Sequence, residues 1–222
     1  MKKKALALAG FGLTVLSLTL AAPASARLVY YAILCDASFN SIAVSKGYPA
    51  CSDMIREEFV KKGIKFINDN TSADTGGVTY YVSGSWSSPA AGSTSGTFLD
   101  SADNYSGFEE QSPWHFKIAF TGKQMSDKAG GSFTKWRGGG GANVAVVSYK
   151  EVGGANNIVW PSTALHEVTH LLRDDGYHHN DDGSTFRTCV MDRLDYSSYT
   201  GIILHEVCSY CRGQINRRVA GW

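Results

Sequence analysis

The segment Ala164–His170, with the sequence Ala-Leu-His-Glu-Val-Thr-His, constrains the fold and the chemistry of this chain of 222 residues more than any other. A spacing of four residues places His166 and His170 above one another on one face of a helix. Both imidazoles can then reach a single Zn²⁺ at about 2.0–2.1 Å, with Glu167 beside the first of them. The pattern therefore predicts a zinc centre in which Glu167 takes a proton from water.

The residues around this segment favour a helix as well. On a wheel of 100° per residue, one apolar stripe lies opposite the two histidines, so the helix has a core face and a ligand face. Pro161 suits the first turn of a helix that follows the apolar run Ile158-Val159-Trp160, and Ser162 and Thr163 suit its start. The stripe consists of Ala164, Leu165, Val168, Leu171 and Leu172.

A catalytic zinc site needs a third protein ligand, and candidates follow downstream in Gly176-Tyr177-His178-His179. A methionine comes later, in Cys189-Val190-Met191-Asp192. Together these strings resemble the metzincin superfamily of zinc endopeptidases, whose motif HExxHxxGxxH is followed by a methionine-containing turn. The turn itself is similar to that of the reprolysin branch. The resemblance implies that His179 is the third ligand and that Met191 forms an apolar floor beneath the ligands.

The chain departs from that motif in one place. The family glycine would fall at Arg173, and three extra residues separate His170 from Gly176. Because arginine does not adopt a positive φ as cheaply as glycine, we expect the helix to continue and to turn at Gly176. His178 is then the alternative third ligand. A carboxylate would give a site with two histidines, and the candidates are Asp174, Asp175 and Asp181.

Hydrophobic periodicity predicts strands and helices in an order that is similar to a metzincin upper domain. The resemblance implies an α+β fold of zincin or metzincin type: a twisted mixed sheet, an active-site helix, and a small C-terminal subdomain that ends in a helix. The strand candidates are Leu28–Leu34, Val78–Val82, Phe116–Phe120 and Ala142–Tyr149. An amphipathic helix is expected at Asp53–Asn68, with Met54, Ile55, Phe59, Ile64 and Ile67 on its apolar side. Ser83–Gly107 is interpreted as a long surface excursion, and Gly138–Gly141 as a turn before a strand.

The N-terminus predicts export. Lys2, Lys3 and Lys4 precede an apolar stretch from Ala5 to Ala22, and Ala24-Ser25-Ala26 is typical of a signal-peptide cleavage site. A membrane anchor is the alternative reading. Cleavage after Ala26 leaves 196 of the 222 residues, one catalytic domain by length, with an upper subdomain of about residues 27–175 and a lower one of about 176–222. The first strand then follows directly, which leaves no room for a sizeable propeptide.

Charge limits the class of partner. Without the three signal lysines the chain has 18 of its 21 basic residues against 20 acidic ones, a net charge of −2. This balance favours neither nucleic acid nor an anionic membrane as a partner. We therefore expect a secreted monomer that acts on proteins or peptides.

Five cysteines in an exported chain predict disulfides and one leftover thiol. Cys35 and Cys51 flank the first strand and the first helix and are expected to pair. A second disulfide is expected from Cys189 to Cys208 or Cys211. The alternative is a second, structural zinc held by these three cysteines and His205, which falls at helical intervals of three residues from Cys208 and Cys211. Cys208-Ser209-Tyr210-Cys211 also resembles the CxxC of the archaemetzincin branch.

These observations favour a zinc-dependent endopeptidase in which His166, His170 and His179 hold the metal and Glu167 is the general base. Tyr196 is a candidate for oxyanion stabilisation, as the resemblance implies, or for the wall of the specificity pocket. A different class remains open: an exported binding protein or toxin on a zincin scaffold without peptidase turnover. A zinc-stabilised structural module is favoured if protein fills all four metal positions.

Overall fold

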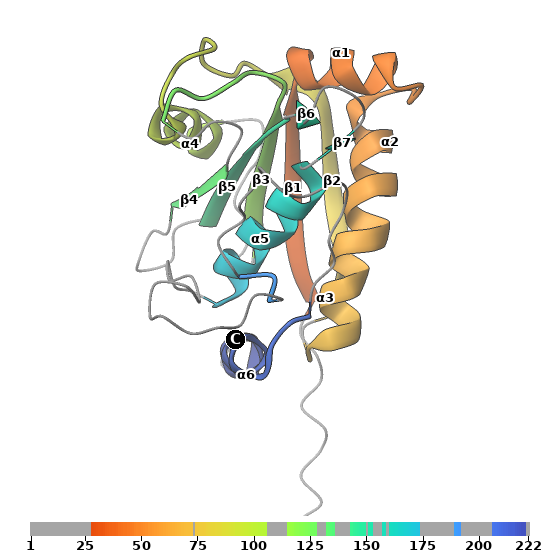
Figure 1. Cartoon of the computed structure of the whole chain (residues 1–222), viewed down its shortest axis with the longest axis vertical. Coiled ribbons are helices and arrows are strands. Elements are labelled where there is room, and N and C mark those ends of the chain that lie inside the picture. Colours follow the sequence, from red (N-terminus) through yellow and green to blue (C-terminus); the bar gives the residue numbers. More distant parts are fainter. Residues whose placement is uncertain are drawn as a thin grey trace, which may run out of the picture.

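The computed structural model describes residues 28–72, 74–105, 115–127, 132–135, 143–149, 151–152, 157–158, 160–173, 189–191 and 206–220. These residues form a mixed α+β fold with one five-stranded sheet at its centre (Figure 1). Within these ranges, every helix is too short or too polar to cross a membrane.

The sheet has the strand order β2-β1-β3-β5-β4. Four of its strands are parallel, and β4 runs antiparallel to β5 at one edge. Its strands are β1 (Leu28–Asp36), β2 (Asp74–Trp86), β3 (His115–Thr121), β4 (Ser132–Lys135) and β5 (Asn143–Ser148). A separate pair consists of β6 (Glu151–Val152) and β7 (Asn157–Ile158).

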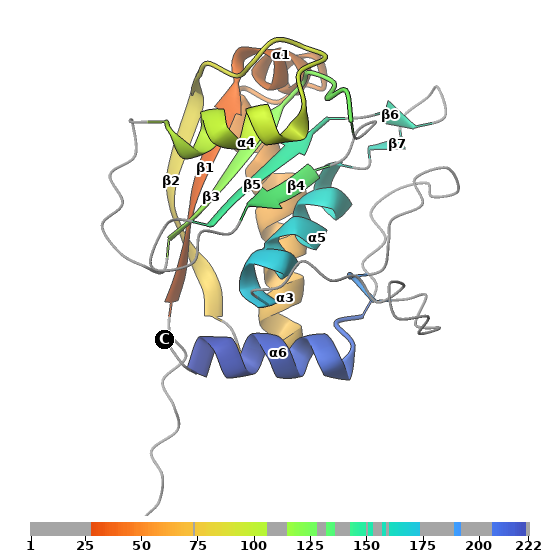
Figure 2. The same cartoon turned by 90° about the vertical axis from the view of Figure 1, so that its left-hand side faces the viewer.

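The strand order determines which face of the sheet each crossover covers. From β1 the chain moves to β2 on one side, and from β2 it returns past β1 to β3 on the other. Because crossovers between parallel strands are right-handed, two moves in opposite directions place their helices on opposite faces. Figure 2 shows this arrangement: α4 (Ser95–Asp103) covers one face, and α3 (Lys65–Asn70) and α5 (Trp160–Arg173) lie behind the other.

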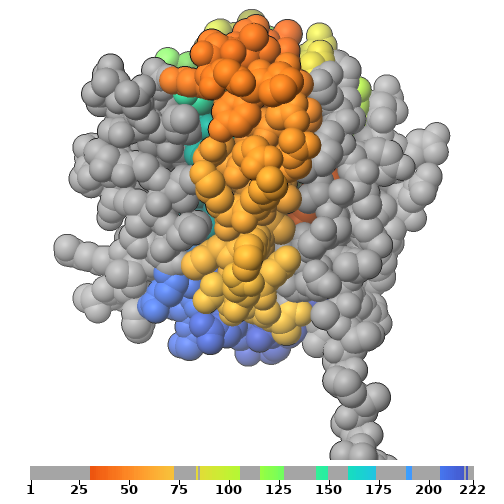
Figure 3. Space-filling model, turned by 90° about the vertical axis from the view of Figure 1, so that its right-hand side faces the viewer, coloured from red at the N-terminus to blue at the C-terminus, as the bar shows by residue number. Residues whose placement is uncertain are grey.

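The crossover from β1 to β2 contains a short helix, α1 (Ala37–Ser45), and a long helical rod. The rod consists of α2 (Cys51–Ile55), a π-helical stretch η1 (Arg56–Ile64) and α3 (Lys65–Asn70). It lies along the surface from α1 to the C-terminal helix α6 (Ser209–Ala220), as Figure 3 shows. Its outward side carries ion pairs four residues apart, such as Glu57 with Lys61, which water screens and which stabilise the helix only weakly.

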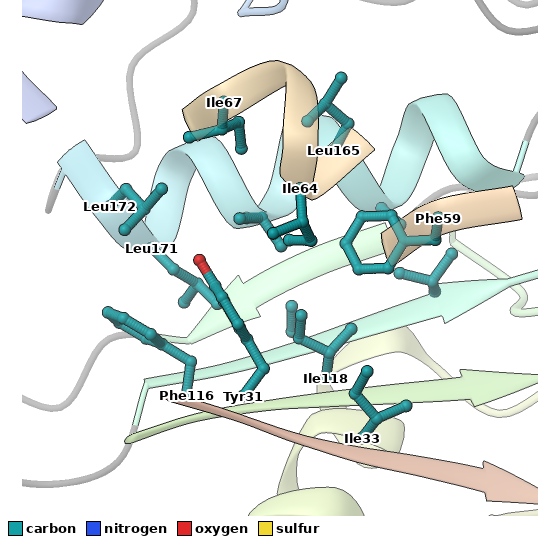
Figure 4. Packing of buried hydrophobic residues seen from close by; sticks show 14 of the residues in the cluster. Tyr31, Ile33, Phe59, Ile64, Ile67, Phe116, Ile118, Leu165, Leu171 and Leu172 are labelled. Carbon is teal, nitrogen blue, oxygen red and sulfur yellow. The ribbon is translucent and has the colours of Figure 1, made fainter. Parts of the chain in front are cut away.

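Alternation along the strands produces two hydrophobic cores. Tyr31 and Ile33 of β1 point toward the rod and α5 (Trp160–Arg173), whereas Leu34 points toward α4. Figure 4 shows the larger core, where strand residues meet Phe59, Ile64 and Ile67 from the rod and Leu165, Leu171 and Leu172 from α5. The smaller core includes Trp86, Phe98, Leu99, Ala119, Met125, Val144 and Val146.

Most of the expected elements are confirmed. The expected strands correspond to β1, β2, β3 and β5, and the helix expected at 53–68 corresponds to the rod, with all five of its apolar-side residues buried. The helix expected from Pro161 onward corresponds to α5, which includes Arg173, and the turn expected at Gly176 lies outside the described residues. α1 and β4 were not expected.

The interpretation of Ser83–Gly107 as a surface excursion is wrong. Its first residues belong to β2, and α4 follows from Ser95. Thr94 caps this helix by accepting a hydrogen bond from the backbone N–H of Thr97 at 3.3 Å. Phe98 and Leu99 are fully buried in the smaller core, so a segment rich in Ser, Gly and Ala contributes a packed helix.

Candidate functional site: a histidine pair beside a cysteine cluster

Helix α5 carries the two histidines and is buried along its whole length. His166, Glu167 and His170 are only 4%, 6% and 6% exposed. Ala164, Leu165, Val168, Leu171 and Leu172 bury the opposite stripe, as the sequence predicts. Both faces of the helix are thus shielded from solvent.

The two imidazoles are close enough to bind one metal ion together. Their Nε2 atoms are 3.2 Å apart, and their rings are nearly perpendicular, with centroids separated by 4.8 Å. One helical turn produces this approach, because residues i and i+4 lie above one another.

A backbone carbonyl fixes the orientation of His166. Its Nδ1–H donates a hydrogen bond of 2.8 Å to the carbonyl oxygen of Val190. In the neutral ring, a proton on Nδ1 leaves the lone pair of Nε2 facing His170. Such a hydrogen bond from the ring nitrogen that does not bind the metal sets the tautomer of histidines that bind metals. Sequence reasoning did not identify Val190, since its contribution is a carbonyl that any residue could supply.

Three cysteines form a second cluster close by. Cys189, Cys208 and Cys211 are buried, and their sulfur atoms lie within 4.8 Å of one another. The disulfide expected from Cys189 is not formed: its Sγ lies 3.6 Å from that of Cys211, whereas a disulfide measures about 2.05 Å. The physical reason is that three thiols, and not two, converge on one point. Their sulfur atoms are spaced as ligands of one metal ion rather than as a bonded pair.

The thiols have unequal acidities. A hydrogen bond from Cys211 lowers the pKa of Cys189 to about 5. The same interaction raises the pKa of Cys211, and burial raises that of Cys208. Cys189 is thus the member of the cluster with thiolate character at neutral pH, and the thiolate is the form that binds metals.

Helix α6 begins at Ser209, so Cys208 precedes the helix and Cys211 lies in its first turn. Glu206 pairs with Cys189 in a parallel bridge, and its carbonyl accepts a hydrogen bond of 3.1 Å from Val190 N–H. Glu206 therefore lies before the C-terminal helix.

The other expected disulfide is confirmed. Cys35, near the end of β1, is bonded to Cys51, the first residue of α2. This bond ties the first strand to the rod.

The carboxyl ends of β1 and β3 form a second polar region. In open α/β sheets this is where ligands often bind, because the strand order reverses there. Here Asp36 fills it, accepting hydrogen bonds from Ser38 Oγ at 2.6 Å, Phe39 N–H at 2.7 Å and Thr121 Oγ1 at 2.6 Å, and from Ser88 Oγ. A Cβ on Gly122 would lie 2.9 Å from the Ser38 backbone, so the turn after β3 is in contact with the first turn of α1.

Asp36 therefore has a structural role. Burial alone would raise its pKa, but its four hydrogen bonds outweigh burial and lower it. Sequence reasoning did not identify this network, whose partners Thr121 and Ser88 are 85 and 52 residues away along the chain.

Several expected features lie outside the described residues. They are the signal peptide and the following residues: Asp174, Asp175, Gly176, His178, His179, Asp181, Tyr196 and His205. Met191, by contrast, is described and is fully buried, and its expected role beneath the ligands stays a prediction.

Comparison with known proteins adds no relative. No protein-family model matches the chain, and no curated protein matches it.

Proposed function

We propose that this protein is a secreted, zinc-dependent endopeptidase of metzincin type. The observation that supports the proposal most is the separation of 3.2 Å between the Nε2 atoms of His166 and His170. Two ligands that bind one tetrahedral zinc at 2.0–2.1 Å are about 3.3 Å apart. The imidazoles thus have the spacing of a ligand pair.

The surrounding residues fit a zinc ion. The Val190 carbonyl fixes the tautomer that leaves Nε2 of His166 available as a ligand. His166 and His170 would hold the ion together with a third ligand, for which His179 is our choice and His178 the alternative. The cysteine cluster could hold a second ion, with a structural role.

Bound zinc would polarise the scissile carbonyl and lower the pKa of water. Glu167, next to His166 and buried beside it, would accept the proton of the attacking water and pass it to the leaving amine.

The fold supports a peptide substrate. Among the described strands, β4 has a partner on one side only, and it contacts α5. An extended peptide could add to this edge as another strand, through hydrogen bonds between main chains. Such a peptide would lie beside the helix that carries the histidines, so the edge strand offers it a path toward them.

The disulfide between Cys35 and Cys51 is compatible with export, since such bonds persist in oxidising compartments. The predicted signal segment gives the same direction. We propose that the mature chain begins at Arg27 and acts as a monomer on proteins outside the cell.

The decisive test is Glu167→Ala in the zinc-loaded protein. We expect hydrolysis of fluorescent casein to fall at least about a hundredfold, the low end for loss of a positioned general base, while zinc content is unchanged. The matched control is Glu57→Ala, which removes an exposed glutamate of η1 and should keep full activity. Near-normal hydrolysis by Glu167→Ala would refute the mechanism. Wild-type protein that binds casein without cleaving it would favour a binding protein or toxin.

The third ligand has its own test. We expect His179→Ala to lose more zinc affinity than His178→Ala, because only His179 completes the Gly-x-x-His register after Gly176. Competition with a chromophoric chelator measures both affinities. A loss confined to His178→Ala would reverse the assignment.

A further inference from the structure

The segment Cys189–Met191 lies between the histidine pair and the cysteine cluster. The carbonyl of Val190 accepts the hydrogen bond from His166 Nδ1, while its N–H donates to the carbonyl of Glu206. Cys189 contributes its thiol to the cluster from the position directly before Val190. The sulfur atom of one site and the oxygen that orients a ligand of the other therefore belong to adjacent residues.

The cluster fixes this segment from two sides. The Sγ of Cys189 contacts that of Cys211 at the first turn of α6, and Cys208 precedes that helix. Along the backbone, Cys189 is joined to Glu206 by the parallel bridge. The bridge and the thiols thus join Cys189 to Glu206 and to the start of the C-terminal helix.

Helix α5 has a second connection to the same region. Arg173 follows His170 by three residues and is 5% exposed, which is unusual for a guanidinium. Its Cζ lies 5.5 Å from the ring centroid of Tyr210, between Cys208 and Cys211 in the sequence. Its positive charge also interacts with Cys211. The active-site helix thus contacts the surroundings of the cluster through His166 and through Arg173.

We propose that the cysteine cluster is a positioning site for His166, which couples the state of its thiols to metal binding at the histidine pair. When the three sulfur atoms are held together, Cys189 is fixed, and the Val190 carbonyl is fixed with it. His166 then keeps Nδ1–H directed at that carbonyl and Nε2 directed at the metal position. Cys211 is accordingly a positioning residue, since it acts on His166 only through the segment 189–191.

Coupling of two binding sites is reciprocal. If a metal ion on the thiols tightens zinc binding at the histidines by some factor, zinc at the histidines tightens metal binding at the thiols by the same factor. The inference rests on the proposed function only in taking the histidine pair as a metal site. It does not require peptide hydrolysis.

The test uses the full chain and Cys211→Ser. We expect the variant to bind zinc at the histidines about tenfold more weakly, the low end for loss of a group that supports a metal ligand. We also expect the Nδ1 proton of His166, assigned by its loss in His166→Ala, to exchange with water faster in histidine-labelled protein. Leu99→Ala is the matched control, because it weakens the smaller core and should leave both readouts unchanged.

The reverse experiment titrates the thiols with Cd²⁺ and follows its sulfur charge-transfer absorption. Zinc bound at the histidines should tighten Cd²⁺ binding by the same factor by which Cd²⁺ on the thiols tightens zinc binding, and His170→Ala should abolish this effect of zinc. If Cys211→Ser fails to fold, Cd²⁺ added to the wild-type protein serves instead and should tighten zinc binding at the histidines.

Unchanged zinc affinity and unchanged Nδ1 exchange, in the variant or on adding Cd²⁺, would overturn the proposal. An inactive protein whose two sites are coupled would refute the peptidase and uphold this inference. An active peptidase with independent sites would do the reverse.

Discussion

Two regions of this protein bury polar side chains against the same sheet, and they do so in different ways. At the carboxyl ends of β1 and β3, four donors converge on the carboxylate of Asp36. Around α5 and residues 189–191, by contrast, imidazoles and thiols converge on one another. The first region has a ready acceptor for its donors, whereas the second gathers atoms whose lone pairs can bind a metal.

This difference distinguishes polar side chains that stabilise the fold from polar side chains that are available to bind a metal. A satisfied network contributes to folding, and it costs stability when one partner is removed. A cluster of ligand atoms gains its stability from an added ion and is otherwise a cost to the fold. The predictions below test whether the two regions separate in this way.

The largest effect is expected from zinc. Free zinc at a thousand times its dissociation constant should stabilise the folded protein by about 4 kcal/mol, because the ion binds the native state. Denaturant unfolding with and without a chelator measures this difference. In His170→Ala most of it should disappear, whereas in Asp36→Asn it should remain whole, since the two regions share none of their described partners. A shift unaffected by His170→Ala would assign the stabilisation to the cysteines.

The next effect concerns Asp36→Ala. Removing the carboxylate leaves the donors of Phe39 and Thr121 buried and unpaired, which should cost about 3 kcal/mol of unfolding free energy. Urea denaturation gives the value. The folded fraction should keep its zinc affinity, and a parallel loss of zinc affinity would join the two regions that we separate here. Ser88→Ala is the milder control, because it removes one of four donors.

Sequence reasoning succeeded where the pattern is local. A continuous apolar run located β1, and the apolar side of residues 53–68 located the rod, because local burial sets both patterns. It failed for α4, whose Ser, Gly and Ala content suggests a loop although Phe98 and Leu99 anchor it in the smaller core. Composition describes the exposed side of that helix, whereas two residues decide its packing.

For the site, the sequence predicted the histidine pair because one helical turn determines its geometry. It could not predict the Val190 carbonyl or the Asp36 network, which depend on contacts between distant segments. The expected second disulfide rested on compartment and cysteine count. Neither reveals that three sulfur atoms meet at one point.

A smaller effect should appear in acid. The hydrogen bonds of Asp36 lower its folded pKa below the ordinary value of about 3.9, despite burial. Its contribution to stability is therefore present above pH 4 and is lost as the pH falls through the lower folded pKa, at about 1.4 kcal/mol for each unit of depression. Asp36→Asn should be less stable at neutral pH and should lose less stability on acidification. Unfolding curves between pH 2 and 6, with parallel slopes for both proteins, would contradict this.

The smallest effect involves a polar group that belongs to neither region. Tyr31 is fully buried, and its hydroxyl has no hydrogen-bond partner among the described residues. Figure 4 shows this oxygen directed away from the sheet, toward Leu171 of α5. Burial raises its pKa, so the hydroxyl stays neutral. Tyr31→Phe removes a desolvated group and keeps the ring that stacks on Phe116, so it should raise the unfolding free energy by about 1 kcal/mol. The control is Phe116→Leu, which loses the ring contact and should be destabilising. If Tyr31→Phe instead lowers stability or zinc affinity, the hydroxyl supports the metal site, and the group of polar side chains that serve that site extends to β1.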